Sequence, residues 1–209
     1  MKNNRCKICR RLGVKLFFKG DRCLSAKCAM VKRPYPPGEK AKKRRGSLSE
    51  YGKELKEKQK LKNWYNLSER QFSRYVMEVL NKRTKTEDAG ALLIKKLENR
   101  LDNVVFQTGF AVSRIQARQL VSHGYFLING RKINIPSYQI KKGDKISLHP
   151  KTSKKAIFNN IVSLLKKRKA PSWIKVNHEK LEVEIVGQAN LEETTPPAEI
   201  SSIFEFYSK

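Results

Sequence analysis

The spacing of apolar residues changes along the chain from a helical period to an alternating one. Between residues 47 and 123, apolar side chains recur every three or four positions, which is typical of helices that bury one face. After residue 125 they alternate with polar ones, as in Phe126 and Ile128, which is typical of half-buried strands. We therefore expect an α+β fold, with a mostly helical N-terminal part and a small, mainly antiparallel sheet.

Serine residues mark where three of the helices begin. Each is followed three residues later by Glu or Gln, which forms a capping box that satisfies free backbone N–H groups. The pairs are Ser47 with Glu50, Ser68 with Gln71, and Ser113 with Gln116. These caps predict helices over residues 47–65, 68–80 and 113–123. A stripe of apolar residues predicts one more helix over residues 89–108.

The stretch from Ser113 to Gly130 is the most informative part of the chain. Its helix carries Arg114, Arg118 and Ser122 at intervals of four residues, so they share a face. Gly124 can end this helix, and the following Asn129-Gly130 pair is the favoured type I′ turn of a tight hairpin. A short basic helix followed at once by a hairpin suits docking against a folded RNA backbone.

Other apolar runs predict strands and one more helix. The helix spans residues 151–169 and stops before Pro171. The strands span residues 14–18, 146–148, 174–176, 181–186 and 203–207.

These elements divide the chain into four regions. Residues 1–46 form a four-cysteine knob and a basic, Pro/Gly-rich arm. Residues 47–96 form a helical domain, which residues 150–209 complete with a C-terminal helix, strands and an acidic tail. Residues 97–149 form a helix–hairpin RNA-binding domain.

Charge indicates the class of partner. Lys and Arg number 46 against 19 Asp and Glu, a net charge of +27, and such an excess is typical of nucleic-acid-binding chains. A merely solvated surface is disfavoured, because this charge would repel itself in an isolated fold. Residues 179–209 hold seven acidic and two basic side chains, so we expect this tail to face a protein rather than RNA.

Several classes of function are disfavoured by what the sequence lacks. No apolar run approaches the roughly 20 residues of a membrane span, and basic residues stand where a signal peptide needs its apolar core. No dinucleotide-binding or P-loop signature occurs. We expect no membrane and no small-molecule substrate, and a cytoplasmic location.

All four cysteines lie near the N-terminus in two close pairs. Cys6 and Cys9 are separated by two residues, and Cys23 and Cys28 by four. Two such pairs can place four thiolates around one tetrahedral Zn²⁺, a closed structural site. Disulfides, which a reducing compartment disfavours, incidental free thiols, and an iron–sulfur cluster remain alternatives. We expect one structural zinc ion.

Residues 32–46 form a proline-rich and then strongly basic segment. Pro34, Pro36 and Pro37 exclude a helix at its start. We interpret it as an extended arm along phosphates, with Tyr35 available to stack on a base or sugar. A solvated linker is the alternative.

Motifs spread over nearly the whole chain resemble the bacterial small ribosomal subunit protein four family. The helix–hairpin stretch is similar to an RNA-binding fold shared by that family and several RNA-modifying enzymes. The matching motifs are Arg5–Arg11, Gly20–Cys28, Arg33–Gly38, Glu57–Leu61, Ser68–Phe72, Glu98–Phe106, Gly109–Arg114 and Glu205–Ser208. Departures are Phe126, Glu39 and a divergent segment at 177–200. Many members lack the cysteines, so zinc rests on the residues present here.

The resemblance implies a structural constituent of the small ribosomal subunit. Such proteins bind the 5′ domain of small-subunit rRNA directly and nucleate assembly. They contact small-subunit protein five, which influences translational accuracy, and with proteins three and five they surround the path by which mRNA enters. Some members bind and repress their own operon mRNA.

The RNA-contacting residues that we expect are basic or polar side chains of the arm, the lysine-rich helix and the helix–hairpin stretch. They are Arg33, Tyr35, Lys40, Lys42, Lys43, Arg44, Arg45, Lys53, Lys58, Lys60, Lys62, Arg70, Arg100, Ser113, Arg114, Arg118, His123, Asn129, Arg131 and Lys132.

An RNA-modifying enzyme and a zinc-finger DNA regulator are the alternative functions. Arg100-Leu101-Asp102 matches an active-site tripeptide of one pseudouridine synthase family, but Asn103-Val-Val-Phe follows in place of Thr-Ser-Gly. We interpret Leu101 as a core residue and Asp102 as a helix-surface or interface carboxylate. A DNA regulator is disfavoured because the basic charge spreads over most of the chain rather than one reading helix. We predict no catalysis.

Overall fold

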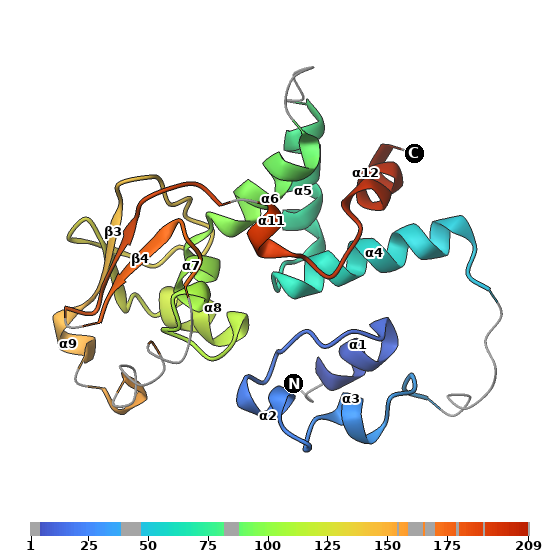
Figure 1. The fold of residues 1–209 in the computed structure, drawn as a ribbon, viewed down its shortest axis with the longest axis horizontal. Helices are drawn as coiled ribbons and strands as arrows, with labels where there is room; N and C mark the ends of the chain where they lie inside the picture. The colour runs from blue at the N-terminus through green and yellow to red at the C-terminus, as the bar shows by residue number, and fades with distance from the viewer. Residues whose placement is uncertain are drawn as a thin grey trace. The chain divides into compact units, whose positions relative to one another are not determined.

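The chain folds into two compact units (Figure 1). The structure is a computed structural model that describes residues 5–38, 47–81, 88–153, 155–158, 165, 170–178, 180–189 and 191–208. One unit comprises Met1–Gly90 with Thr195–Lys209, and the other comprises Ala91–Thr194. The division falls within helix α6 (Ala89–Glu98).

The first unit is helical in its described part. Its helices are α1 (Arg5–Leu12), α2 (Asp21–Leu24), α3 (Ala29–Lys32), α4 (Glu50–Trp64), α5 (Glu69–Asn81) and α12 (Ile200–Ser208). The C-terminal helix α12 packs on α4 and α5. Ile203 of α12 is fully buried, and the Tyr207 ring lies 6.3 Å from the ring of Phe72 in α5. The end of the chain therefore supplies part of the core of this unit.

Two strands predicted in this unit are absent from its described residues. The segment predicted as a strand over 203–207 is helix α12, because Ile203 and Tyr207, four residues apart, both reach the helical core. Residues 14–18 form no strand. Phe17 there has φ 50°, and its ring packs edge-on against Trp64 at 6.2 Å.

Serine caps α4 and α5 of this unit, although one of the two caps is not the predicted one. The Ser68 hydroxyl accepts the Gln71 N–H at 3.3 Å, which confirms that cap. The helix expected at Ser47 begins instead at Glu50, and Ser49 is the N-cap, whose hydroxyl accepts the Gly52 N–H. The prediction of a helix over this region is otherwise confirmed.

The second unit is built on a five-stranded antiparallel sheet with the strand order β2-β1-β3-β5-β4. Its strands are β1 (Phe126–Ile128), β2 (Arg131–Ile133), β3 (Lys145–Leu148), β4 (Ile174–Asn177) and β5 (Glu182–Ile185). Helices α7 (Leu101–Gln107) and α8 (Arg114–Ser122) share one hydrophobic core with the inward-facing strand residues. The α+β fold and the small antiparallel sheet are thus confirmed.

Residues 150–194 belong to this second unit. Because β5 pairs with β3 and β4 pairs with β5, this segment completes the sheet rather than the helical domain to which the sequence assigned it. It also contains α9 (Pro150–Ser153), the 3-10 helix η2 (Ala156–Phe158) and α11 (Leu191–Thr194). Most of the helix predicted over 151–169 lies outside the described residues.

The single helix predicted over residues 89–108 is two helices. Between α6 and α7, Arg100 is extended, with φ −69° and ψ 137°, and it forms an antiparallel bridge with Gln139. The Leu101 N–H donates to the carbonyl of Tyr138 at 2.9 Å. The break therefore depends on a segment almost forty residues later, which an apolar period cannot reveal.

None of the described helices combines the length and the apolar character needed to cross a membrane.

Candidate nucleic-acid interface and cysteine cluster

Helix α8 and the hairpin after it form as the local sequence dictates. The Ser113 hydroxyl accepts the Gln116 N–H at 3.3 Å, so the predicted cap is confirmed. The Gln116 side chain accepts the Val112 N–H at 2.9 Å, one residue earlier than the predicted box requires. Asn129 and Gly130 have φ 49° and 78°, the two positive values that a type I′ turn needs.

The surface of this stretch is basic. Between Asp102 and Asp144 the sequence contains no Asp or Glu. Helix α8 buries Ala117, Leu120 and Val121 against the sheet, and its other face and the hairpin remain outside the core. Exposed side chains on that outer side are Gln119, Ser122, His123, Asn129, Arg131 and Lys132. The stretch itself therefore supplies no carboxylate that would neutralise a phosphate-binding charge, and Asp144, which follows it, accepts a hydrogen bond from Asn129.

The two arginines of α8 are only half exposed. The Arg114 Nε donates to Asn103 Oδ1 at 2.9 Å, and its guanidinium lies 4.5 Å from the centre of the Phe106 ring. Asn103 in turn donates to Glu98 Oε2 at 2.7 Å. Arg114 therefore anchors α8 to α7 as well as contributing charge, a role that spacing alone did not indicate.

Arg100, expected among the RNA-contacting residues, lies in the core. It has no exposed surface, and its guanidinium donates to both carboxylate oxygens of Asp102, from Nε at 3.0 Å and from a terminal nitrogen at 2.6 Å. Burial raises the pKa of Asp102, and the charges of Arg100 and Arg118 oppose that rise. Asp102 is thus a buried ion-pair partner and not the surface carboxylate expected from the sequence.

Most of the predicted lysine contacts on α4 are held in ion pairs. Lys58, which is buried, and Lys62 both donate to Glu69, at 2.8 and 2.9 Å, and Lys60 pairs with Glu57 at 2.5 Å. Lys53 on α4 and Arg70 on α5 are exposed. The arm residues Lys40, Lys42, Lys43, Arg44 and Arg45 lie outside the described residues. Their predicted contacts with RNA stay predictions.

Arg10 fixes the start of the arm. Its Nε donates to the carbonyls of Arg33 and Tyr35 at 2.9 and 2.8 Å. Its guanidinium lies 5.0 Å from the centre of the Tyr35 ring, so one face of the ring predicted to stack on RNA is covered by Arg10. Arg33 itself is exposed.

Hydrogen bonds from the hairpin to the start of β3 hold Asn129, another predicted contact. Its side-chain amide donates to Asp144 Oδ1 and its oxygen accepts the Lys145 N–H, both at 2.9 Å. Ser113 is buried as the cap of α8. Arg131 and Lys132 are the exposed predicted residues on this hairpin.

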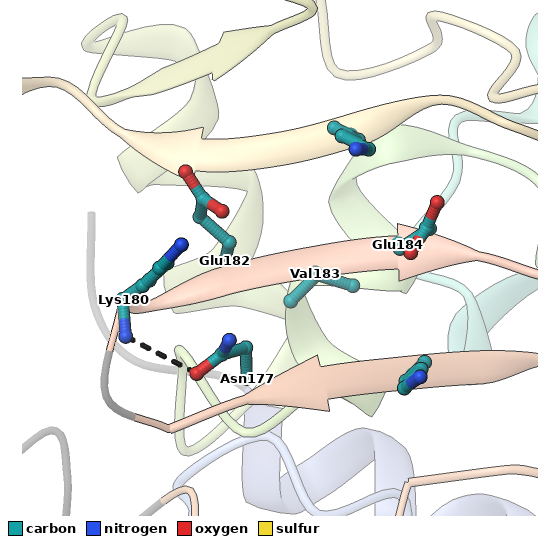
Figure 2. Close-up of a pocket in the computed structure, with 7 residues that line it drawn as sticks. Asn177, Lys180, Glu182, Val183 and Glu184 are labelled. Atoms are coloured by element: carbon teal, nitrogen blue, oxygen red, sulfur yellow. Dashed lines mark hydrogen bonds between the residues drawn. The ribbon is translucent and has the colours of Figure 1, made fainter.

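The outer face of the sheet carries a hollow of mixed charge (Figure 2). Its lining includes Lys145, Lys175, Asn177, Lys180, Glu182, Val183 and Glu184. The strand register places Glu184 between Lys145 on β3 and Lys175 on β4, and the Lys180 N–H donates to Asn177 Oδ1 at 3.2 Å. Opposite charges alternate across these strands, which stabilises the sheet and leaves little excess charge for a polyanion.

The four cysteines line one small hollow of about 20 Å³. Cys9, Cys23 and Cys28 are buried and Cys6 is half-buried. The Lys19 N–H donates to Cys23 Sγ at 3.4 Å, a backbone contact of the kind that supports a thiolate. Burial raises the pKa of the Cys9 thiol, the nearby sulfurs add to the rise, and a backbone hydrogen bond at Leu16 opposes it.

The fold brings the four sulfurs together without forming a complete metal geometry. Among the described residues, no three Cys, His, Asp or Glu side chains are close enough to form a metal site as placed. No disulfide joins the four cysteines. The donor type fits a soft ion, since four cysteines line the same hollow and thiolates are the ligands that such ions prefer.

Comparison with known families gives the class of the protein. Residues 1–98 match the model of the ribosomal protein S4/S9 N-terminal domain, and residues 99–146 match the S4 domain, which contains α8 and the hairpin. The chain therefore combines a ribosomal helical domain with an S4 domain.

Relatives over the full length narrow the class to one family. Small ribosomal subunit protein uS4 of Thermotoga petrophila is 44% identical over 205 residues, 98% of this chain and 96% of the relative. The uS4 proteins of Thermus thermophilus and Caldicellulosiruptor saccharolyticus are 42% and 46% identical over 204 residues, with the same coverage. The chain belongs to the small ribosomal subunit protein uS4 family. Members are ribosomal structural proteins, so the prediction of a non-catalytic chain is confirmed.

Proposed function

We propose that this chain is a structural constituent of the small ribosomal subunit and binds the 5′ domain of small-subunit rRNA directly. The single observation that carries the proposal is the exposed outer surface of α8 and the hairpin, within a stretch that has no acidic residue from Asn103 to Gly143. Membership of the uS4 family supports it. The carboxylate of the Arg100-Leu101-Asp102 tripeptide is not available for chemistry on the RNA, because Asp102 has both oxygens engaged by Arg100.

The finer roles follow from the same assignment. The chain nucleates subunit assembly, contacts small-subunit proteins five and three, and lies near the path by which mRNA enters, where it influences translational accuracy. The exposed Arg70 and Lys53 and the basic arm at 40–45 supply further contacts to RNA. The same RNA-binding surface also binds the mRNA of the chain's own operon and represses its translation.

Binding to transcribed rRNA tests the main proposal. The full chain is titrated against a 5′-domain transcript and a length-matched unrelated RNA at several salt concentrations. We expect a preference for the ribosomal transcript and a steep loss of affinity with salt, with a slope of about 0.9 for each phosphate neutralised on a duplex. Equal affinity for both RNAs would contradict specific rRNA binding, and an affinity that ignores salt would contradict phosphate contacts.

We also propose that Cys6, Cys9, Cys23 and Cys28 hold one structural Zn²⁺. A bound ion would cross-link α1, which holds Cys6 and Cys9, to Cys23 in α2 and to Cys28 at the N-cap of α3, and so contribute to folding rather than to chemistry. Elemental analysis of protein purified without chelator is expected to give about one zinc per chain if four thiolates close one site. A matched C6S/C9S variant is expected to lose the metal. Iron with visible absorbance would indicate the cluster instead, and no metal at all would refute both.

A further inference from the structure

Three positively charged or protonatable side chains gather around the turn that follows α8. Lys155 Nζ donates to the Tyr125 hydroxyl at 3.1 Å and lies 4.4 Å from the centre of its ring. His123, the C-cap of α8, places Nδ1 3.5 Å from the same hydroxyl. Lys132 of β2 covers Gly124, since a Cβ built there would meet its Cε at 2.4 Å and its Nζ at 3.2 Å.

The base of this cluster is fixed. The Tyr125 ring packs edge-on against Phe158 at 5.9 Å, and the Tyr125 carbonyl accepts the His149 N–H at 2.9 Å. The Thr152 hydroxyl donates to the His149 carbonyl at 2.7 Å and lies 3.4 Å from the Tyr125 carbonyl. The phenol is therefore held by contacts on both its ring and its backbone, while His123 and Lys155 are exposed.

The cluster carries the positive charges of Lys132 and Lys155 and the hydroxyl proton of Tyr125. Within the described part of the chain, neither Lys132 nor Lys155 forms an ion pair with a carboxylate. The Tyr125 hydroxyl accepts from Lys155 and lies 3.5 Å from His123 Nδ1, so when that nitrogen carries a proton the phenol proton is available to an outside acceptor. An anion with several oxygens can accept from the phenol and from the Lys155 ammonium beside it, and Lys132, which lies against the adjacent Gly124, adds a second positive charge to the same turn.

We propose that His123, Tyr125, Lys132 and Lys155 form a seat for one phosphodiester group of the bound RNA. The proposal rests on the proposed rRNA binding and adds a contact beyond the α8 helix. Lys155 lies outside residues 99–146, which match the S4 domain, so this seat joins the domain to the segment that follows it. Tyr125 donates to a phosphate oxygen, and the two lysines neutralise its charge.

The test compares full-chain variants on the 5′-domain transcript. Lys155→Gln removes a cation, Tyr125→Phe removes only the hydroxyl, and Lys155→Arg keeps the charge. Lys180→Gln, in the exposed turn beside β4, is the matched control for losing one lysine charge. Thermal melting of each variant confirms that the fold is retained.

If the seat binds a phosphate, Lys155→Gln weakens binding about fivefold at 0.15 M salt and lowers the salt slope by about 0.9. Tyr125→Phe weakens binding roughly threefold, the loss of one hydrogen bond, with a smaller change of slope. Lys155→Arg and Lys180→Gln keep the wild-type slope. Wild-type behaviour of both Lys155→Gln and Tyr125→Phe overturns the seat, as does an equal loss in Lys180→Gln. If the wild-type chain itself shows no preference for rRNA, the proposed function is overturned. That result needs no variant, so it can be told apart from a failure of the seat.

Discussion

Arg100 and Asp102 form a bidentate ion pair inside the second unit, at the point where the chain passes from α6 to α7. Two hydrogen bonds, at 3.0 and 2.6 Å, join the guanidinium to the two carboxylate oxygens, and both side chains are almost entirely buried. The pair makes the burial of Arg100 tolerable, because it neutralises a charge that could not otherwise leave water.

Removing one partner of this pair is expected to destabilise the protein strongly. Asp102→Ala leaves a buried guanidinium without its carboxylate, which costs about 3–5 kcal/mol. Arg100→Met with Asp102→Leu removes both charges and is expected to be less destabilised than the single variant. Urea unfolding measures both, with Ser122→Ala at the exposed end of α8 as the control. A single variant as stable as the wild type would show that the pair does not hold the core.

The cap of α8 gives a smaller and more local prediction. Ser113→Ala removes the oxygen that accepts the Gln116 N–H and is expected to cost about 1 kcal/mol of unfolding free energy. Ser113→Thr keeps that oxygen and should recover most of the loss. Ser122→Ala, at the exposed C-terminal end of the same helix, is the matched control. If the two alanine variants unfold at the same urea concentration, Ser113 is not a stabilising cap.

Local signals predicted α8 and its hairpin, and non-local contacts account for what the sequence did not predict. Ser113, Gly124 and Asn129-Gly130 act on their own neighbours, so their roles can be inferred from spacing. The break before α7 depends on Gln139 and Tyr138, far along the chain.

The strand predicted over residues 203–207 is wrong for a related reason. The run from Ile203 to Tyr207 is rich in aromatic residues, which are typical of strands, and the helix forms where this segment packs on α4 and α5. The predicted RNA-contacting residues show the same limit of local sequence signals. Residue type marks Arg100 and Lys58 as candidates for RNA contact, and only the fold shows that both are buried in ion pairs.

Glu69 is expected to make the stability of the first unit sensitive to acid. Burial alone would raise its pKa, but hydrogen bonds from Lys58, Lys62 and Tyr207 outweigh that effect and lower the pKa from 4.5 to about 2. A carboxyl whose pKa is lowered by folding stabilises the folded state above its unfolded pKa, and this contribution is lost as the pH falls from about 4.5 towards 2.

Comparing the wild type with Glu69→Gln isolates this contribution. Unfolding free energies are measured between pH 6 and pH 2.5, and the difference between the two proteins is expected to shrink as the pH falls. The effect is modest, since the Glu69 side chain is 46% exposed and solvent screens its ion pairs. A difference that stays constant over this range would mean that Glu69 is not ionised more readily in the folded state.

Arg114 and Arg131 are expected to separate stability from RNA binding. Arg114 is tied to Asn103 and lies over Phe106, so Arg114→Gln should cost about 1–2 kcal/mol of unfolding free energy. Arg131 is exposed on the hairpin, and Arg131→Gln should change stability by no more than about 0.5 kcal/mol. If each arginine neutralises one phosphate, each variant also weakens rRNA binding about fivefold at 0.15 M salt. If Arg131→Gln binds rRNA as strongly as the wild type, Arg131 of the hairpin is not part of the interface. If Arg114→Gln melts at the wild-type temperature, the contacts of Arg114 to α7 do not stabilise the domain.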